Sequence, residues 1–310
     1  MRVRFLGTST SYGVPVIGCR CATCCSTDPR NKRTRASVYL ESDEGVRLLI
    51  DSGPELRVQA LREGVTRLDA VLYTHFHADH TAGIDDLKAF NAALGGVLPC
   101  FGDAPTGVSL RERFAYAFAG TPWIGLIPHI NYTAVDSKPF YVGKTCIQPV
   151  PMRHGAIRAT GYRVDNFAYL TDTSGVPAAS RALLHDLDVV VVDALRWEPH
   201  PTHLSVPEAL ELIGDIQPRH AYLTHVGHTL EHETTNLRVG PDVEVAFDGL
   251  ELTLARYAFS RSRVPAFARS RLRAFPPSRV RAFFRCRVSS LGEAVARSGR
   301  RSTTSSHGCG

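Results

Sequence analysis

A short stretch from Thr74 to His80 constrains this chain more than any other part of its sequence. It reads Thr-His-Phe-His-Ala-Asp-His, so three imidazoles and one carboxylate stand at H-x-H-x-D-H spacing. Burying these groups without partners would be costly, and a metal ion is a partner that suits all four. The run that begins at Asp69 is apolar and β-prone, which predicts a buried strand ending at the histidines. We therefore predict a metal site in a loop at the carboxyl end of a strand.

The spacing of the four side chains indicates more than one metal ion. In an extended or turning segment His75 and His77 point to the same side, whereas Asp79 and His80 lie further along and can face a displaced point. This arrangement suits two cations a few ångströms apart. A histidine-rich surface loop without metal is the alternative, but such a loop seldom carries these ligand types at this spacing.

Length and composition set the broad class. The chain has 310 residues, of which 44% are hydrophobic, enough for one large αβ domain or two small ones. It contains no apolar run of about eighteen residues, and its opening residues are too few for a signal peptide. We therefore expect a cytoplasmic protein without a membrane segment, in which the eight cysteines are thiols or metal ligands rather than disulfides.

The charge is unevenly distributed along the chain. Residues 257–310 contain twelve arginines, no lysine and one acid, a net charge of +11, whereas residues 1–256 carry a net charge of −5. We predict that residues 1–256 form the folded domain and that 257–310 are an Arg-rich disordered tail, because scattered apolar residues cannot build a core. The acidic body argues against a nucleic-acid surface, while the tail leaves binding to RNA or a membrane open.

The order of elements predicts two facing sheets with helices outside. Strands are expected at residues 1–7, 37–41, 46–51, 69–74, 145–150, 162–164, 168–172, 189–193, 221–224, 243–248 and 251–256. Helices are expected at 55–63, 83–94, 109–119, 177–187, 206–216 and 230–237, and residues 121–136 show no clear periodicity.

The histidine-rich motif resembles the H-x-H-x-D-H signature of the metallo-β-lactamase fold superfamily. The resemblance implies an αββα sandwich of two mixed sheets and a dinuclear site whose remaining ligands follow later strands. It places His75, His77 and His154 on one metal, Asp79, His80 and His225 on the other, and Asp172 between them. Asp51 would then accept a hydrogen bond from a ligand histidine, with a helix cap as its alternative role.

A cluster of cysteines narrows the resemblance. Cys19, Cys21 and Cys24 offer three soft donors, and a tetrahedral zinc needs one more, for which His228 is the natural candidate. The pairing of G-C-x-C-x-x-C with a late T-H-x-x-H resembles the phosphoribosyl cyclic phosphodiesterase group and its relatives, in which these residues hold a structural zinc. Cys25 departs from the pattern and is expected to be a spare thiol.

The resemblance implies a hydrolase with Asp79, Asp172 and His203 as catalytic residues. Two cations would lower the pKa of a shared water, and His203 would protonate the leaving group, with His200 as the fallback. Oxygen and nitrogen ligands permit Mn²⁺ as well as Zn²⁺. We expect the substrate to be a small phosphodiester, cyclic or linear, and leave a homodimer open. The alternatives are a ribonuclease Z-like nuclease, a lactonase or thioesterase, and a non-catalytic protein of quinone-cofactor biosynthesis with the same fold.

Overall fold

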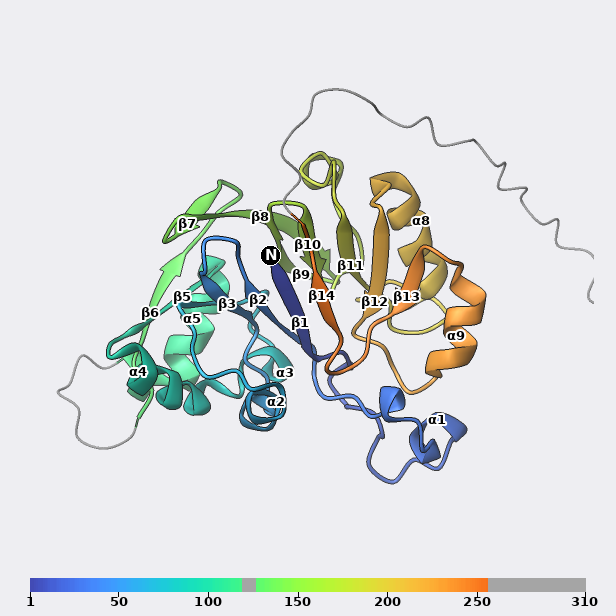
Figure 1. Ribbon diagram of the computed structural model, residues 1–310, viewed down its shortest axis with the longest axis horizontal. Coiled ribbons are helices and arrows are strands. Elements are labelled where there is room, and N and C mark those ends of the chain that lie inside the picture. Colours follow the sequence, from blue (N-terminus) through green and yellow to red (C-terminus); the bar gives the residue numbers. More distant parts are fainter. Residues whose placement is uncertain (119–126, 256–310) are drawn as a thin grey trace, which may run out of the picture. The chain divides into compact units, whose positions relative to one another are not determined.

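The computed structural model describes residues 1–118 and 127–255 (Figure 1). Residues 119–126 and 256–310 lie outside the described part. The predicted domain boundary after residue 256 and the predicted disorder of the Arg-rich tail therefore stay predictions.

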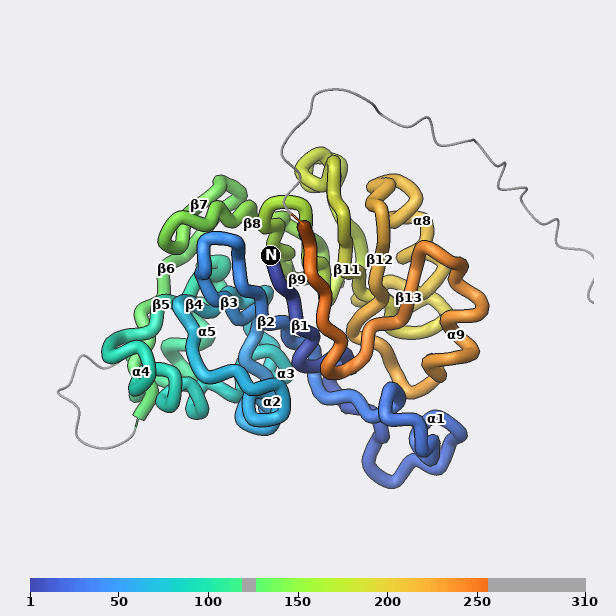
Figure 2. Tube along the Cα trace, in the orientation of Figure 1, coloured from blue at the N-terminus to red at the C-terminus, as the bar shows by residue number. Residues whose placement is uncertain are grey.

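Two sheets of seven strands each form the centre of the described chain, as Figures 1 and 2 show. The first sheet has the order β14 (Glu251–Thr253), β1 (Arg2–Gly7), β2 (Ser37–Glu41), β3 (Arg47–Ile50), β4 (Ala70–Leu72), β5 (Leu98–Gly102) and β6 (Ile130–Ala134). The second has the order β13 (Val243–Val245), β12 (His220–Thr224), β11 (Val189–Asp193), β10 (Phe167–Leu170), β9 (Ile157–Val164), β8 (Thr145–His154) and β7 (Phe140–Val142). Both sheets are mixed, with antiparallel pairs on one side and parallel pairs on the other.

Helices flank each sheet on its outer side. The longer ones are α2 (Leu56–Glu63), α4 (Lys88–Leu94) and α5 (Ala104–Arg113) beside the first sheet, and α8 (Val206–Ile216) and α9 (His232–Val239) beside the second. The remaining helices are single turns: α1 (Ala22–Cys25), α3 (Ala78–Thr81), α6 (Ala115–Phe118), α7 (Ala178–Arg181) and the 3₁₀ turns at Pro29–Asn31 and Ile84–Leu87. Among the residues described, no helix has the length and apolar character needed to cross a bilayer.

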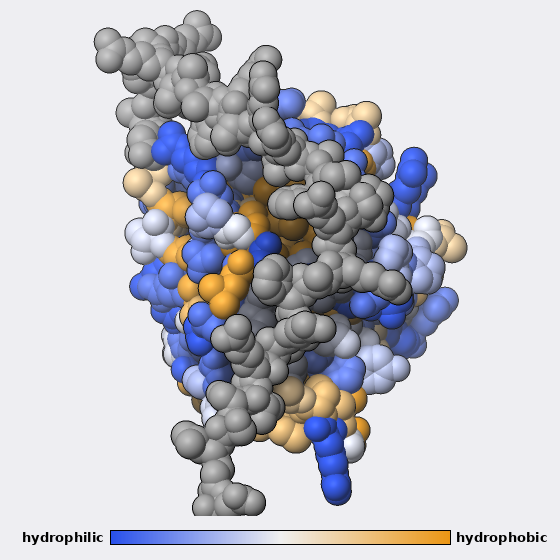
Figure 3. Space-filling model, turned by 90° about the vertical axis from the view of Figure 1, so that its right-hand side faces the viewer, coloured by the Kyte–Doolittle hydropathy of each residue, from blue (hydrophilic) through white to orange (hydrophobic). Residues whose placement is uncertain are grey.

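Three apolar layers hold the sandwich together. The central layer joins the inner faces of the two sheets, where Phe5 of β1 meets Tyr222 of β12 with ring centroids 5.7 Å apart. The outer layers bury the helices, such as the Leu212 face of α8 against the second sheet. On the face shown in Figure 3, hydrophilic residues dominate the visible part and hydrophobic ones gather in smaller patches. The predicted αββα sandwich is confirmed.

Some predicted elements differ from the structure. The helix predicted at 177–187 is wrong, because only Ala178–Arg181 is α-helical and Asp186, with a left-handed φ of 55°, cannot continue a helix. Strand β9 begins at Ile157 and not at Tyr162, and β5 and β6 were not predicted. Strand β9 has a glycine, Gly161, in its interior, where a Cβ would stand 2.9 Å from the carbonyl oxygen of Tyr169 on the neighbouring strand and leave too little space.

One edge of the sandwich collects the polar residues predicted for the site. Asp51 follows β3, His75 lies beyond β4, and Asp172 and His225 follow β10 and β12. His154 is the last residue of β8, at the turn into β9. Side chains that are far apart in sequence therefore meet at the carboxyl ends of these strands.

Candidate metal centre

His75, His77 and His154 form the first group of donors. Nε2 of His75 lies 2.9 Å from Nδ1 of His77, and Nε2 of His154 lies 3.4 Å from the same atom. Burial lowers the pKa of all three imidazoles, which favours the neutral form that binds a metal. Three ring nitrogens that converge in this way form a group that could hold a metal ion.

The second group lies beside the first and consists of Asp79, His80, Asp172 and His225, one potential ligand atom of each lying within 4.8 Å of the others. The Asp172 carboxylate links the groups, since its oxygens are 3.1 Å from His80 Nε2, 3.3 Å from His225 Nε2 and 3.8 Å from His75 Nε2. Burial opposes its ionisation, yet the adjacent His225 and His80 hold the pKa of Asp172 well below its usual range. The seven predicted ligands therefore lie around one centre, with Asp172 in the middle.

The protonation pattern of His80 shows that a cation fits this group. His80 is wholly buried and its Nδ1 donates to the carboxylate of Asp51 at 2.7 Å, so in a neutral ring the lone pair is on Nε2. Nε2 then faces Asp79 and Asp172 carboxylate oxygens at 3.2 and 3.1 Å and has no hydrogen-bond partner in the described part of the chain. Burial disfavours charge on the ring, but Asp172 and Asp79 raise the pKa of His80 well above its usual value. This excess of negative charge is what a divalent ion would neutralise.

Asp51 supports histidines of both groups. Besides His80, its carboxylate accepts hydrogen bonds from the backbone N–H and the hydroxyl of Thr74, each at 2.8 Å. Because that hydroxyl donates to Asp51, its oxygen is left to accept from Nδ1 of His75 at 3.0 Å. One buried carboxylate thus directs Nε2 of both His75 and His80 toward the centre.

Backbone strain marks the same positions. Asp51, Asp172 and His225 adopt left-handed φ angles of 65°, 54° and 57°, which non-glycine residues seldom adopt. Such strain persists where surrounding contacts over-determine the conformation, and it concentrates at functional sites.

The cysteine cluster forms a separate donor set on the segment around α1. Sγ of Cys19 lies 3.3 Å from Nδ1 of His228, and Sγ of Cys21 and Cys24 each lie 3.6 Å from it. The Cys24 backbone N–H, a hydrogen-bond donor to the Cys21 sulfur, lowers the pKa of Cys21 to about 6, which favours the thiolate. Three sulfurs and one imidazole nitrogen fit a tetrahedral zinc. Cys25 is exposed and stands outside this cluster.

His203 lies at the rim of the two donor groups. Its Nδ1 donates to Oδ2 of Asp193 at 2.9 Å, and its ring stacks on His225 at 4.7 Å. The start of α8 holds this segment, because Ser205 and Glu208 form a reciprocal capping box two residues later. His200 accepts from the hydroxyl of Thr202 at 3.2 Å and does not line the pocket.

Asp193, which the sequence patterns did not single out, contacts two of the site histidines. It ends β11, is wholly buried, and also accepts a hydrogen bond from the Thr173 backbone N–H at 2.9 Å. Its other oxygen is 3.7 Å from Nδ1 of His225, so it stands between two site histidines. The sequence feature that points to Asp193 is its position at the end of an apolar strand, which it shares with Asp51.

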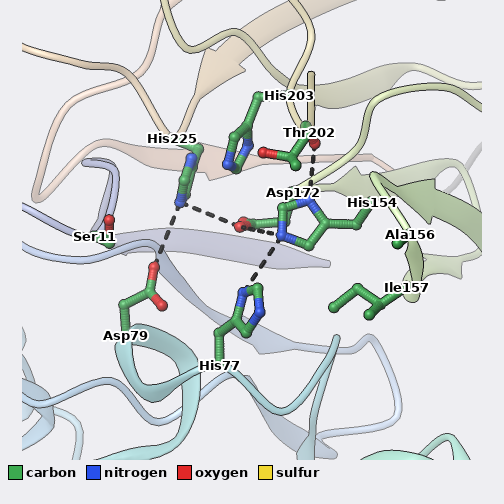
Figure 4. Close-up of a pocket in the computed structure, with 10 residues that line it drawn as sticks. All are labelled: Ser11, His77, Asp79, His154, Ala156, Ile157, Asp172, Thr202, His203 and His225. Carbon is green, nitrogen blue, oxygen red and sulfur yellow. Dashed lines mark hydrogen bonds and ion pairs between the residues drawn. The ribbon is translucent and has the colours of Figure 1, made fainter. Parts of the chain in front are cut away.

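A cavity of about 370 Å³ opens over these groups (Figure 4). Besides six of the predicted site residues, its walls include Ser11, Ala156, Ile157 and Thr202, none of which was predicted. Hydroxyl and apolar residues carry no sequence signal for such a role, and only the fold brings them to the site.

Comparisons with known proteins agree with this geometry. Residues 46–226 match the family model described as β-lactamase superfamily domain. The crystal structure of a diphosphatase from the PhnP family is 38% identical, with a TM-score of 0.76, over 82% of this chain and 98% of that one.

Two further matches are more distant or partial. An octanoyltransferase of Porphyromonas gingivalis is 35% identical over 254 residues, which are 81% of this chain but only 51% of that relative. The chain thus spans about half the length of that protein. The structure of Zn²⁺-bound PqqB from Methylobacterium extorquens, 18% identical with a TM-score of 0.67, covers 82% of this chain and all of that one, and shares the fold.

Proposed function

Because the chain belongs to the β-lactamase superfamily and has the fold of its metal-dependent hydrolases, we propose that it is a phosphodiesterase acting on a small phosphodiester, cyclic or linear. One observation carries the proposal. Seven metal-donor side chains converge on one centre, five of them line a single cavity, and a histidine held by a buried carboxylate lies at its rim.

Two divalent ions, Zn²⁺ or Mn²⁺, are the cofactors that we propose for the seven donors. When bound, they would supply Lewis acidity to a phosphoryl group and lower the pKa of a water molecule. The chain's own residues position this chemistry, since Asp51 sets the tautomer of His75 and His80 and Asp172 connects the two groups. A third ion, Zn²⁺, is proposed for Cys19, Cys21, Cys24 and His228, where it would join the α1 segment to the segment after β12.

We propose His203 as the general acid. With Nδ1–H donated to Asp193, Nε2 is the atom that can carry a proton into the cavity. The Asp193 carboxylate holds the ring of His203 in the orientation that turns Nε2 toward the cavity. His200 lacks such a carboxylate partner in the described residues, which supports His203 as the donor.

The substrate class rests on the comparison with the PhnP-family diphosphatase. That neighbour is 38% identical to this chain and is named a diphosphatase. Diphosphate cleavage is therefore the second candidate activity. A ribonuclease Z-like nuclease, a lactonase and a thioesterase use other electrophiles or larger substrates. The non-catalytic PqqB-like alternative predicts gaps in the donor set, whereas here all seven positions hold a donor.

The test is hydrolysis of bis(p-nitrophenyl) phosphate by the metal-loaded full chain. We expect turnover that falls to background in the His77→Ala, Asp172→Ala double variant, while His200→Gln stays near wild type. Because p-nitrophenolate leaves without a proton, the fall of about 100-fold or more in kcat expected for His203→Gln is measured on a diester with an alkyl leaving group. A panel containing a nucleoside diphosphate, a lactone, a thioester and a precursor tRNA identifies the reaction class. Turnover of the lactone or thioester without phosphodiester hydrolysis would reject the proposal.

We also propose a polyanionic partner for the Arg-rich tail. Residues 256–287 consist of four consecutive eight-residue units, RYAFSRSR, VPAFARSR, LRAFPPSR and VRAFFRCR, each with Ala-Phe at its centre and Arg at its end. Regularly spaced arginines neutralise phosphates, and phenylalanines stack on bases, so single-stranded RNA or DNA is the fitting ligand. Salt-dependent binding of labelled oligonucleotide to the full chain, absent from a chain ending at residue 255, tests this.

A further inference from the structure

The cavity over the donor groups has two chemically different ends. Figure 4 shows Ser11 on one side, beyond Asp79, and Ala156 and Ile157 on the other side, beyond His77 and His154. Ser11 offers a hydroxyl, and its carbonyl accepts a hydrogen bond from Nε of Arg35 at 2.9 Å. Ala156 and Ile157 are the apolar residues among those described as lining the cavity.

The strand register explains why Ile157 faces the cavity. In the antiparallel pair of β8 and β9, Ile157 stands directly opposite His154, so both side chains lie on the same face of the sheet. The next pair, Arg153 and Arg158, must face the opposite way, and both residues are exposed. Ile157 is therefore fixed beside a proposed metal ligand, whereas its neighbour Arg158 is directed away from the cavity.

The turn that carries this apolar wall is held in place. Gly155 has a left-handed φ of 58°, and a Cβ there would meet Thr202 Cγ2 at 2.6 Å, so the turn packs directly on the segment before His203. His154 donates from Nδ1 to the Thr202 carbonyl at 2.8 Å, and the backbone of Arg153 bonds to Gly175 at 3.0 Å. The wall is thus preorganised relative to the donors.

We propose that Ile157, with Ala156, forms an apolar subsite for one ester arm of the substrate, and that the other arm lies toward the Ser11 end. The substrate is then an asymmetric phosphodiester with one flat or apolar arm, such as an aromatic or heterocyclic ring, and one polar arm. This inference deepens the proposed function and rests on it. An apolar residue at this position contributes affinity in proportion to the apolar area that an arm covers.

Binding of two non-hydrolysed diesters, diphenyl phosphate and dimethyl phosphate, isolates the subsite. Their dissociation constants are measured on the metal-loaded full chain by calorimetry, and the ratio of the two reports the contribution of the aryl arm. In Ile157→Thr, which keeps the β-branch but adds a hydroxyl, we expect the preference for diphenyl phosphate to fall about five- to tenfold. Ile157→Val and Arg158→Ala should each keep the ratio within about twofold of wild type, with unchanged metal content.

The outcomes separate the subsite from the proposed function. An unchanged ratio in Ile157→Thr, with both diesters still binding, overturns the subsite alone. An equal fall in Arg158→Ala also overturns it, because that side chain lies on the other face. If neither diester binds the metal-loaded wild type, both the subsite and the proposed function fail.

Discussion

Replacing Asp51 by asparagine should weaken metal binding at the donor group of His80 without removing any proposed ligand. Asparagine has nearly the same shape, but one carboxylate oxygen becomes an NH₂ donor. The two oxygens of Asp51 accept from the Thr74 N–H at 2.8 Å, the Thr74 hydroxyl at 2.8 Å and Nδ1–H of His80 at 2.7 Å. Whichever of the two oxygen positions the new NH₂ takes, it therefore faces a group that also donates a hydrogen bond.

The hydrogen bonds around Asp51 predict which histidine changes its tautomer in Asp51→Asn. The Thr74 hydroxyl can rotate to accept a hydrogen bond, but its backbone N–H cannot, so the NH₂ is expected to face Thr74 Oγ1 and His80 Nδ1. His80 must then move its proton to Nε2, the atom that faces Asp79 and Asp172. A protonated Nε2 has no lone pair for a cation, as in catalytic triads where the same substitution imposes the wrong tautomer.

The expected loss is about 10- to 100-fold in affinity for the metal held by the His80 group, or about 1.4 to 2.7 kcal/mol. Thr74→Val is the matched comparison, because it removes the hydroxyl that connects Asp51 to His75 and leaves the bond to His80. Thr74→Val should lower the metal affinity of the His75 group more than that of the His80 group. Competition with a fluorescent chelator measures both affinities, and the zinc proposed for the cysteine cluster serves as an internal reference. Wild-type affinity at both groups in folded Asp51→Asn would refute the reasoning.

Three other predictions concern the rest of the fold. Cys21→Ser should lower the metal content from three ions per chain to two, measured by elemental analysis, and leave the other two ions in place; retention of three refutes the assigned site. Burial and the adjacent Arg33 lower the pKa of His232 from 6.5 to about 4. Between these two pH values the unfolded chain binds a proton at His232 that the folded chain does not bind. The free energy of unfolding should then fall as the pH drops from 6.5 to 4, by up to about 1.4 kcal/mol per pH unit. Urea unfolding at several pH values measures this fall, which should be smaller in His232→Gln; an equal fall in the variant and the wild type would contradict the assignment. Gly83→Ala should cost about 3 kcal/mol in the same assay, because its Cβ would lie 2.1 Å from the Gly53 carbonyl oxygen, whereas Gly96→Ala, with open space around it, should be near neutral.

The sequence predicted the residues of the donor groups better than the walls around them. Histidine and aspartate at strand ends are visible as patterns, and the structure brings His75, His154, Asp172 and His225 together as the resemblance implied. Ile157 could not be found in this way, because its role depends on the register of β8 against β9, which the sequence does not specify.

Asp193 shows a different limit of the sequence. A carboxylate at the end of an apolar strand was visible, but the choice between a metal ligand, a helix cap and a partner for His203 depends on which strands are neighbours. The parallel pairing of β11 with β10 and β12 puts Asp193 between the Asp172 and His225 segments, where its Oδ2 accepts a hydrogen bond from His203. Short apolar strands such as β5 escaped prediction because their length and composition do not distinguish them from buried helical turns.

The first strand of the sandwich has a neighbour from the far end of the described chain. Strand β1 pairs with β14, and the amino terminus donates to the Leu254 carbonyl at 2.9 Å. During synthesis on the ribosome, the second edge of β1 stays uncovered until β14 has been made, and His225 precedes β14 by only a short segment. A nascent chain therefore holds the complete donor set only after residue 225 has been made, and the first sheet is completed only after β14 has followed.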